Sequence, residues 1–234
     1  MINMVKLNTF SITARCAKTG QLGIAVSTKL PGVGMLCPFV KAGVGAVATQ
    51  SFVNPYIGIR GLEHLSSGMS AQEAKEKIMA EEINLEHRQF AIVDKDGGTA
   101  AFSGNECDGY YNHFEGDGFV VAGNMLVNEE TLTDMKAAFE NHTGLDLSER
   151  LLRALEAGQA AGGDKRGKQS AALKVFDTEE YPFVDLRVDE HEDPVAELAR
   201  VYDVAKEELL PFMPMMPTKE NPGGSFNPDE YEAE

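Results

Sequence analysis

Two segments near the start of the chain alternate strictly between larger apolar residues and small or polar ones. In the first segment, Phe10, Ile12 and Ala14 would lie on one face of an extended strand, with threonine and serine side chains on the other face. Residues 22–27 alternate in the same way, and the Lys-Thr-Gly sequence between the two segments is typical of a turn. Residues 9–27 therefore predict a β-hairpin, which requires a sheet with two chemically different faces.

Helical patterns occur in pairs between further blocks of strands. Residues 60–82 and 130–160 each predict a pair of helices, because apolar residues recur there at helical spacing. Ser70 and Glu73 form a capping box for the second helix of the first pair. The other predicted elements are strands at 46–49, 90–93, 99–103, 119–122, 170–176 and 183–188, and a last helix that begins at Asp193-Pro194.

This order of elements predicts an α+β protein with two stacked, mainly antiparallel sheets flanked by helices on both outer faces. It disfavours a single parallel sheet, because helices and strands do not alternate singly. The 234 residues suffice for one large domain with its own core. We expect a leader at residues 1–8, a domain at 9–210, and a Pro- and Met-rich, acidic arm at 211–234 that cannot form a core alone.

The charge balance excludes some classes of partner. The chain has 37 Asp and Glu against 21 Lys and Arg, which gives a net charge of −16. Such a surface repels phosphate backbones and anionic lipids, so we expect neither nucleic acid nor a membrane as a partner. No apolar run approaches the roughly 18 residues of a membrane helix, and the first residues lack the apolar region of a signal peptide. We therefore expect a cytoplasmic protein.

Metal and cofactor sites have little support in the sequence. Cys16, Cys37 and Cys107 lack the spacing of metal ligands, and their odd number favours buried, reduced thiols. The acidic residues 189–193 precede a predicted helix, where carboxylates favour the helix dipole, so we interpret them as capping residues. The sequence predicts no metal and no cofactor.

Several phrases of the chain are similar to one bacterial family. They are TFSITAR (9–15), GQLGIAVSTK (20–29), AGVGAVATQ (42–50), NPYIGIRGLEHL (54–65), AGNML (122–126) and AGGDKRGKQSAAL (161–173). They resemble the N-terminal-nucleophile (Ntn) hydrolase-like proteins grouped as the domain of unknown function 1028, over roughly residues 9–200. The resemblance implies the four-layer αββα sandwich of proteasome-like enzymes.

The same resemblance implies a nucleophile at Thr9. In Ntn hydrolases a Thr, Ser or Cys begins the first strand and uses its own α-amine, which titrates near about 7.7–8.0, as the base. By position, Asn124 would donate to a developing oxyanion, Asp164 would orient the amine of the nucleophile, and Ser170 would share that hydrogen-bond network. Each residue also has a structural interpretation: Thr9 favours strands, Asn124 follows a glycine at a strand end, and Asp164 could cap a turn.

Substrate-binding groups follow from the resemblance and from charge. Backbone N–H groups around Thr49 and Gln50 would be oxyanion donors by analogy. Arg60 or Arg166 could hold a carboxylate through bidentate hydrogen bonds, although ion pairs at the surface are a commoner use of arginine. Where proteasome-like enzymes place a lysine near the third strand, this chain offers Cys37.

Eight residues precede Thr9, so its nitrogen is part of a peptide bond with Asn8. Two functions stay open. The first is an amidohydrolase that acts on a small amide through Thr9 once the Asn8–Thr9 bond is cut. The second is a non-catalytic protein that binds a small metabolite while the leader blocks Thr9. We also expect a homo-oligomer, most simply a dimer, in which the segment after Leu210 contacts the neighbouring subunit, and a mainly structural oligomer is a third interpretation.

Overall fold

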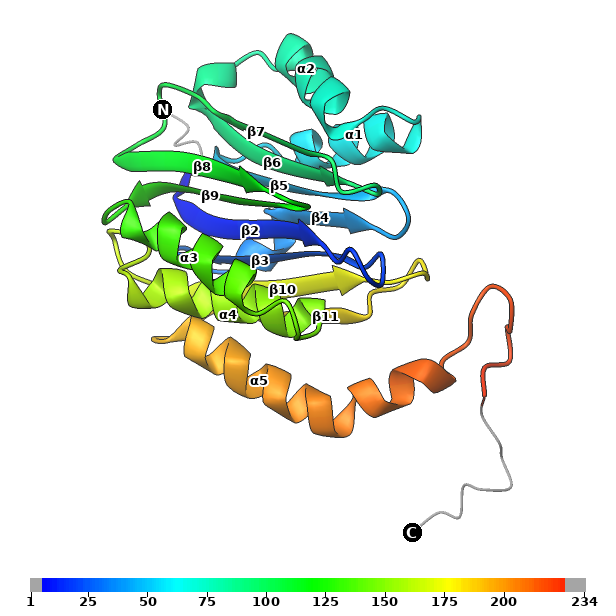
Figure 1. The fold of residues 1–234 in the computed structure, drawn as a ribbon. Helices are drawn as coiled ribbons and strands as arrows, with labels where there is room; N and C mark the ends of the chain where they lie inside the picture. Colours follow the sequence, from blue (N-terminus) through cyan, green and yellow to red (C-terminus); the bar gives the residue numbers. More distant parts are fainter. Residues whose placement is uncertain (1–5, 226–234) are drawn as a thin grey trace.

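The computed structural model describes residues 6–225, and its strands form two antiparallel sheets (Figure 1). The five-stranded sheet has the order β1-β5-β6-β7, with β4 also paired to β5, and the six-stranded sheet has the order β11-β10-β3-β2-β9-β8. The strands of the five-stranded sheet are β1 (Lys6–Leu7), β4 (Pro38–Lys41), β5 (Gly45–Phe52), β6 (Arg88–Asp94) and β7 (Thr99–Ser103). Those of the six-stranded sheet are β2 (Thr9–Arg15), β3 (Leu22–Thr28), β8 (Tyr110–Gly116), β9 (Phe119–Leu126), β10 (Ser170–Phe176) and β11 (Val184–Val188).

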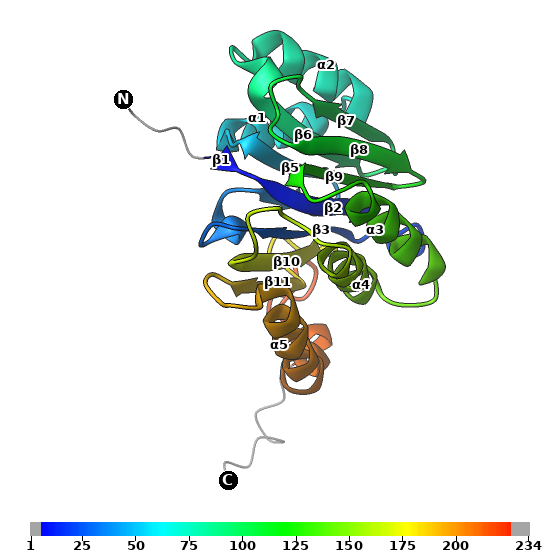
Figure 2. The ribbon, with the colours of Figure 1, turned by 90° about the vertical axis from the view of Figure 1, so that its left-hand side faces the viewer.

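Helices cover the outer face of each sheet, so the molecule has four layers (Figure 2). The helices are α1 (Pro55–Ser66), α2 (Ala71–Glu81), α3 (Glu130–Asn141), α4 (Leu147–Ala160) and α5 (Pro194–Glu208), with 3-10 turns at Val33–Met35, Leu85–His87 and Leu210–Met215. Helices α1 and α2 pack on the five-stranded sheet, whereas α3 and α4 pack on the six-stranded sheet. The predicted αββα sandwich is confirmed. Each described helix is too short or too polar to cross a membrane.

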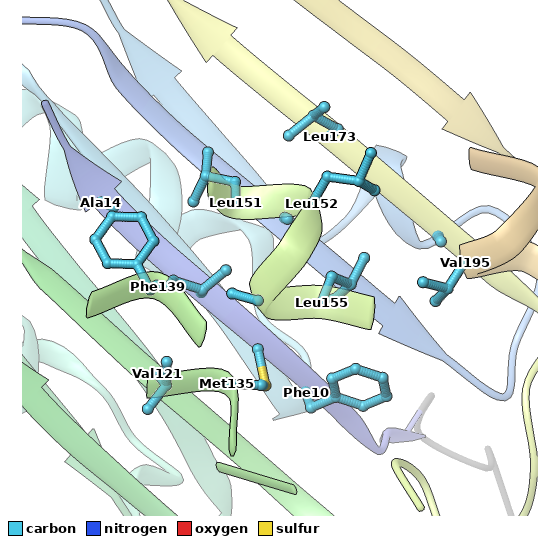
Figure 3. Close-up of a cluster of buried hydrophobic side chains, with 14 of the residues drawn as sticks. Phe10, Ala14, Val121, Met135, Phe139, Leu151, Leu152, Leu155, Leu173 and Val195 are labelled. Atoms are coloured by element: carbon cyan, nitrogen blue, oxygen red, sulfur yellow. The ribbon is translucent and has the colours of Figure 1, made fainter. Parts of the chain in front are cut away.

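The alternation of the first hairpin sets the two faces of the six-stranded sheet. Strand β2 pairs with β3 in the register that joins Thr9 to Thr28. Phe10 and Ile12 are buried against α3 and α4, in the cluster that Figure 3 shows. Thr9 and Ser11, on alternate positions, therefore face the other sheet. Helix α4 lies close against β3, because a Cβ atom on Gly23 would come within 2.7 Å of a Leu151 methyl group.

The space between the two sheets is apolar at one end of β2 and polar at the other. Leu22, Ile24 and Val26 of β3 contribute to an apolar cluster that both sheets share. Toward the start of β2 the buried side chains are instead polar, and they include Thr9, Ser11 and Gln50. Buried polar groups need hydrogen-bond partners, so this region is where a functional site would be built.

The C-terminal segment lies against its own chain. The hydroxyl of Tyr181 donates to the carbonyl of Pro217 at 2.8 Å, and the backbone N–H of Lys219 donates to Glu179 at 3.2 Å. These bonds attach the segment after α5 to the β10–β11 turn. Several apolar side chains of α5 and this segment stay exposed: Val204, Leu209, Phe212, Met215 and Met216.

Candidate active site

Residues 6–8 cross from one sheet to the other immediately before Thr9. Strand β1 pairs with the end of β5, with Leu7 opposite Ser51, in the five-stranded sheet. Thr9 begins β2 in the six-stranded sheet. The peptide that joins the two strands is enclosed, since Asn8 is 3% exposed and Thr9 is 0% exposed. In the intact chain, the Thr9 side chain is therefore shielded from solvent.

Two donors converge on the carbonyl oxygen of Asn8. The Thr28 hydroxyl donates to it at 2.6 Å, and Nη2 of Arg166 donates at 3.1 Å. The Thr9 hydroxyl donates in turn to the Thr28 hydroxyl at 3.3 Å. Two hydrogen bonds thus polarise the carbonyl of the Asn8–Thr9 bond, and the next side chain along the chain is the hydroxyl group of Thr9.

Asp164 fixes the position of the Arg166 guanidinium. Its carboxylate accepts from Nη2 of Arg166 at 2.6 Å and from Nε at 3.1 Å. Backbone N–H groups of Arg166 and Lys29 complete its bonds, at 2.9 and 3.1 Å. The Asp164 side chain is 1% exposed, so the carboxylate of the Asp164–Arg166 ion pair is fully desolvated. Gly162 and Gly163, at φ 125° and 63°, allow the chain to turn into this position.

A buried network of amides lies beside Thr9 and joins the two sheets. The ladder between β2 and β9 ends at the pair of Phe10 and Gly123, and Thr9 and Asn124 are the next residues beyond it on the two strands. Asn124 Nδ2 donates to Gln89 Oε1 at 2.9 Å, and Gln50 Nε2 donates to the same oxygen at 2.7 Å. The Ser11 hydroxyl donates to Gln50 at 2.8 Å. Among the described residues, Asn124 Oδ1 is buried and has no hydrogen-bond partner.

Backbone strain occurs at the same end of the sandwich. Ser51 and Met125 have φ values of 68° and 52°, in the left-handed region that non-glycine residues seldom adopt. Ser51 follows Gln50 in β5, and Met125 follows Asn124 in β9. Strained backbone of this kind persists where the surrounding structure enforces it, and it is frequent at functional sites.

The structure thus brings together Thr9, Asn124, Asp164, Arg166 and Gln50 at this end of the sandwich. Thr28 and Gln89 also belong to the site, although the sequence did not point to them. The hairpin register could have identified Thr28, since a turn centred between residues 18 and 19 pairs position 9 with position 28.

Two other predicted site residues, Thr49 and Ser170, have different partners. The backbone N–H of Thr49 donates to the Cys37 carbonyl at 3.1 Å, so it is not a free oxyanion donor. The Ser170 hydroxyl donates to the carbonyl of Leu30 and accepts from the N–H of Val33, so it fixes the loop after β3 and does not bind Asp164.

Arg60 lies on the outer helix α1, on the far side of the five-stranded sheet from Thr9. It pairs with Glu82 at 3.2 Å and with Glu81 at 3.7 Å. Arg88 pairs with Glu82 from the other side at 3.0 Å, and these residues line a cavity of about 400 Å³. Arg60 is therefore separate from the site around Thr9.

Cys37, at the position where proteasome-like enzymes have a lysine, carries no charge. Cys37 is buried, and that burial raises the pKa of its thiol to about 12. Arg166 is instead the cation that contacts the Asn8–Thr9 peptide. In residues 6–225, no three His, Cys, Asp or Glu side chains gather so that they could hold a metal ion.

Solved structures were compared with the chain. Protein SPO2555 from Silicibacter pomeroyi is 29% identical, with a TM-score of 0.84 over 92% of this chain and 98% of that one. HslV from Trypanosoma brucei is 12% identical with a TM-score of 0.45, over 72% of this chain and 99% of that one. Anbu from Yersinia bercovieri is 10% identical with a TM-score of 0.39, over 88% and 99%.

No curated protein matches the sequence. The model of a family described as "Family of unknown function (DUF1028)" matches residues 9–198, which is most of the chain and includes every residue of the site around Thr9 except Asn8. The chain belongs to the DUF1028 family.

Proposed function

We propose that this chain is the precursor of an Ntn-type amidohydrolase, and that its first substrate is its own Asn8–Thr9 bond. The observation that carries the proposal is the carbonyl of Asn8, which accepts hydrogen bonds from Thr28 and Arg166 beside the Thr9 hydroxyl. Donors placed at a carbonyl oxygen stabilise the negative charge that develops there during acyl transfer. Burial of the site strengthens this effect, because it excludes water.

The self-cleavage begins with attack of Thr9 Oγ1 on the carbonyl carbon of Asn8. The Thr9 proton passes to Thr28, and the Thr28 proton passes to the carbonyl oxygen, along the two hydrogen bonds that join these groups. The tetrahedral intermediate then breaks its C–N bond, the C=O bond re-forms, and the proton on its oxygen passes to the nitrogen of Thr9. The acyl group of Asn8 is left as an ester on Thr9 Oγ1. Water hydrolyses the ester, which restores the hydroxyl, frees the amine and releases residues 1–8.

The mature enzyme would repeat this chemistry on a small amide. The free α-amine of Thr9 serves as the base, and the acyl carbonyl of the substrate takes the place of the Asn8 carbonyl, beside Thr28 and Arg166. The Asp164 carboxylate holds Arg166 in position, and Gln89 holds the amide of Asn124. Removal of the leader also opens the end of the sandwich that Asn8 now closes.

The test compares full-length protein, a protein that begins at Thr9, and the Thr9→Ala variant of each. We expect full-length protein to lose residues 1–8 on incubation, and the form that begins at Thr9 to hydrolyse members of a panel of small acyl-amides. Intact mass, N-terminal sequencing and amide hydrolysis are the measurements. Thr9→Ala should abolish both reactions, because the nucleophile is gone.

Thr13→Ala is the matched control. Thr13 is buried on the same strand and face as Thr9, and its hydroxyl has no hydrogen-bond partner among the described residues. This variant should cleave and hydrolyse at the unaltered rate. Activity in full-length protein that survives Thr9→Ala would overturn the mechanism.

A non-catalytic binding protein is the second candidate. It is favoured by the complete burial of Thr9 and by the pairing of β1 with β5, which holds the residues just before Thr9 in the five-stranded sheet. This candidate predicts that the intact mass never changes and that the protein beginning at Thr9 stays inactive on the whole panel.

We also propose a homodimer formed through the C-terminal segment. Phe212, Met215 and Met216 are 51%, 43% and 42% exposed, and burial against a second copy would remove this apolar surface from water. Truncation after Leu210 is expected to lower the molecular mass measured by light scattering. Tyr181→Phe is the control, because it removes the bond from Tyr181 to the segment but keeps the apolar side chains. An unchanged mass after truncation would exclude this role of the segment.

A further inference from the structure

A second cavity lies at the opposite end of β2 from Thr9. It has a volume of about 270 Å³, and its wall includes Arg15, Cys16, Lys18, Phe139 and Arg150. Arg15 ends the strand that Thr9 begins, so roughly 20 Å of extended chain separates the two sites. The cavity therefore has no part in the chemistry proposed at Thr9.

Three cations of this cavity lack a carboxylate partner. Among the described residues, Arg15, Lys18 and Arg150 form no salt bridge, although the chain carries 37 acidic residues. The Nε atoms of both arginines are buried and have no hydrogen-bond partner there. Two acidic residues, Asp117 and Glu140, also line the cavity. The cavity therefore has an excess of positive charge in a strongly acidic protein, and it suits an anionic ligand.

The two acidic residues compensate little of this charge. Asp117 and Glu140 are both exposed, so water screens them, as it also screens the exposed Lys18. Glu140 also lies 3.9 Å from the ammonium of Lys136, which balances its charge. Arg150, by contrast, is half-buried, and its guanidinium stacks 3.8 Å from the centre of the Phe139 ring and donates to the carbonyl of that residue. Arg150 is thus held in a fixed position at the cavity.

Cys16 lines this cavity, and the residue is 8% exposed. Burial acts to raise the pKa of its thiol. That effect is outweighed by hydrogen bonds from the hydroxyl and N–H of Thr19 and from the N–H of Lys18, together with the charge of Arg150, so the pKa is lowered. Burial raises the pKa of the thiols of Cys37 and Cys107. Because the thiolate is the reactive form, Cys16 differs from the other two cysteines in the direction that favours reaction.

We propose that this cavity is a modification site in which Cys16 reacts with small disulfides that carry carboxylates. The sulfur of Cys16, as thiolate, attacks one sulfur of the disulfide R–S–S–R. A protein–S–S–R bond forms, the original S–S bond breaks, and R–S⁻ leaves and takes up a proton from water. The disulfide is the oxidant, and the carboxylates of its R groups are attracted by Arg15, Lys18 and Arg150.

The test uses native full-length protein with oxidised glutathione, which is anionic, and with hydroxyethyl disulfide, which is neutral. Intact mass gives the rate, and peptide mapping gives the modified cysteine. We expect one added group on Cys16, none on Cys16→Ser protein, and no comparable reaction at Cys37 or Cys107. Modification of Cys37 or Cys107 as fast as of Cys16 would overturn the proposal.

The charge of the cavity is tested by the ratio of the two rates. Lys18→Gln should lower the rate with oxidised glutathione relative to hydroxyethyl disulfide by roughly twofold to fivefold. Lys41→Gln is the matched control, since Lys41 is also exposed and makes an equally long 3.5 Å bond outside the cavity. Arg150→Gln should lower the ratio further. Equal ratios for Lys18→Gln and Lys41→Gln would overturn the assignment of an anionic partner.

Discussion

Thr28→Val is expected to slow the release of residues 1–8 by about 10²–10³-fold, which is the usual effect of removing one donor from a developing oxyanion. Thr28 donates to the Asn8 carbonyl at 2.6 Å and accepts from the Thr9 hydroxyl at 3.3 Å. Valine has nearly the same shape, but it can neither relay the proton nor stabilise the oxyanion. The measurement is the intact mass of freshly purified protein followed over time.

Thr28→Ser is the control for this prediction. Serine keeps the hydroxyl and removes one methyl group, so cleavage should continue within a few-fold of the unaltered rate. Arg166→Gln removes the other donor to the Asn8 carbonyl and should also slow cleavage. Equal rates for Thr28→Val and Thr28→Ser would show that the Thr28 hydroxyl takes no part in the reaction.

Much of the fold was predictable because its strands and helices follow local patterns. The hairpin at 9–27 is confirmed, and its second strand extends by one residue to Thr28. The capping box of Ser70 and Glu73 is present at the start of α2. Pro194 begins α5, but Asp193 makes no capping bond and pairs with Lys168 at 2.7 Å. These features depend on a few neighbouring residues, so the sequence alone carries them.

Strand β8 was not predicted. Its sequence, Tyr110–Gly116, mixes aromatic residues with Asn112, His113 and Glu115, and no residue of the strand is fully buried. The strand lies at the edge of its sheet and has no apolar face with a period of two. Its conformation comes from pairing with β9, a partner that the strand sequence alone does not reveal.

The sequence could predict only those residues of the candidate site that lie in the phrases similar to the family. Thr9, Thr28, Asn124 and Asp164 all lie in phrases that resemble the family, but the place of Thr28 in the site follows from the β2–β3 register. Gln89 lies outside these phrases and reaches the site through the pairing of β5 with β6. Gln89 directly precedes an apolar run, and from the sequence alone it would be interpreted as an exposed residue at the start of a strand. Stacking of the two sheets buries it completely. Polar residues of this kind cannot be separated from surface residues until the layers are known.

Gln89→Leu is expected to destabilise the fold by about 2–6 kcal/mol, a large part of the roughly 5–15 kcal/mol that stabilises a typical domain. Gln89 Oε1 accepts from Gln50 at 2.7 Å and from Asn124 at 2.9 Å, and its Nε2 lies 2.7 Å from Ser103 Oγ and 2.9 Å from the Gly123 carbonyl. Leucine fills a similar volume but leaves two buried amide donors without an acceptor, at about 1–3 kcal/mol each. Urea unfolding followed by circular dichroism measures the loss.

Gln72→Leu is the matched control for this variant. Gln72 is exposed on α2 and bonds only to Glu76, at 2.9 Å among the described contacts, so the same substitution there should change stability by about 0.5 kcal/mol or less. The difference in stability loss between Gln89→Leu and Gln72→Leu tests whether the hydrogen bonds among Gln50, Gln89 and Asn124 hold the two sheets together near Thr9. A loss below about 1 kcal/mol for Gln89→Leu would mean that water or rearranged side chains satisfy Gln50 and Asn124. In that case the hydrogen bonds to Gln89 would not fix the position of Asn124. Other contacts would have to supply the rigidity that self-cleavage requires.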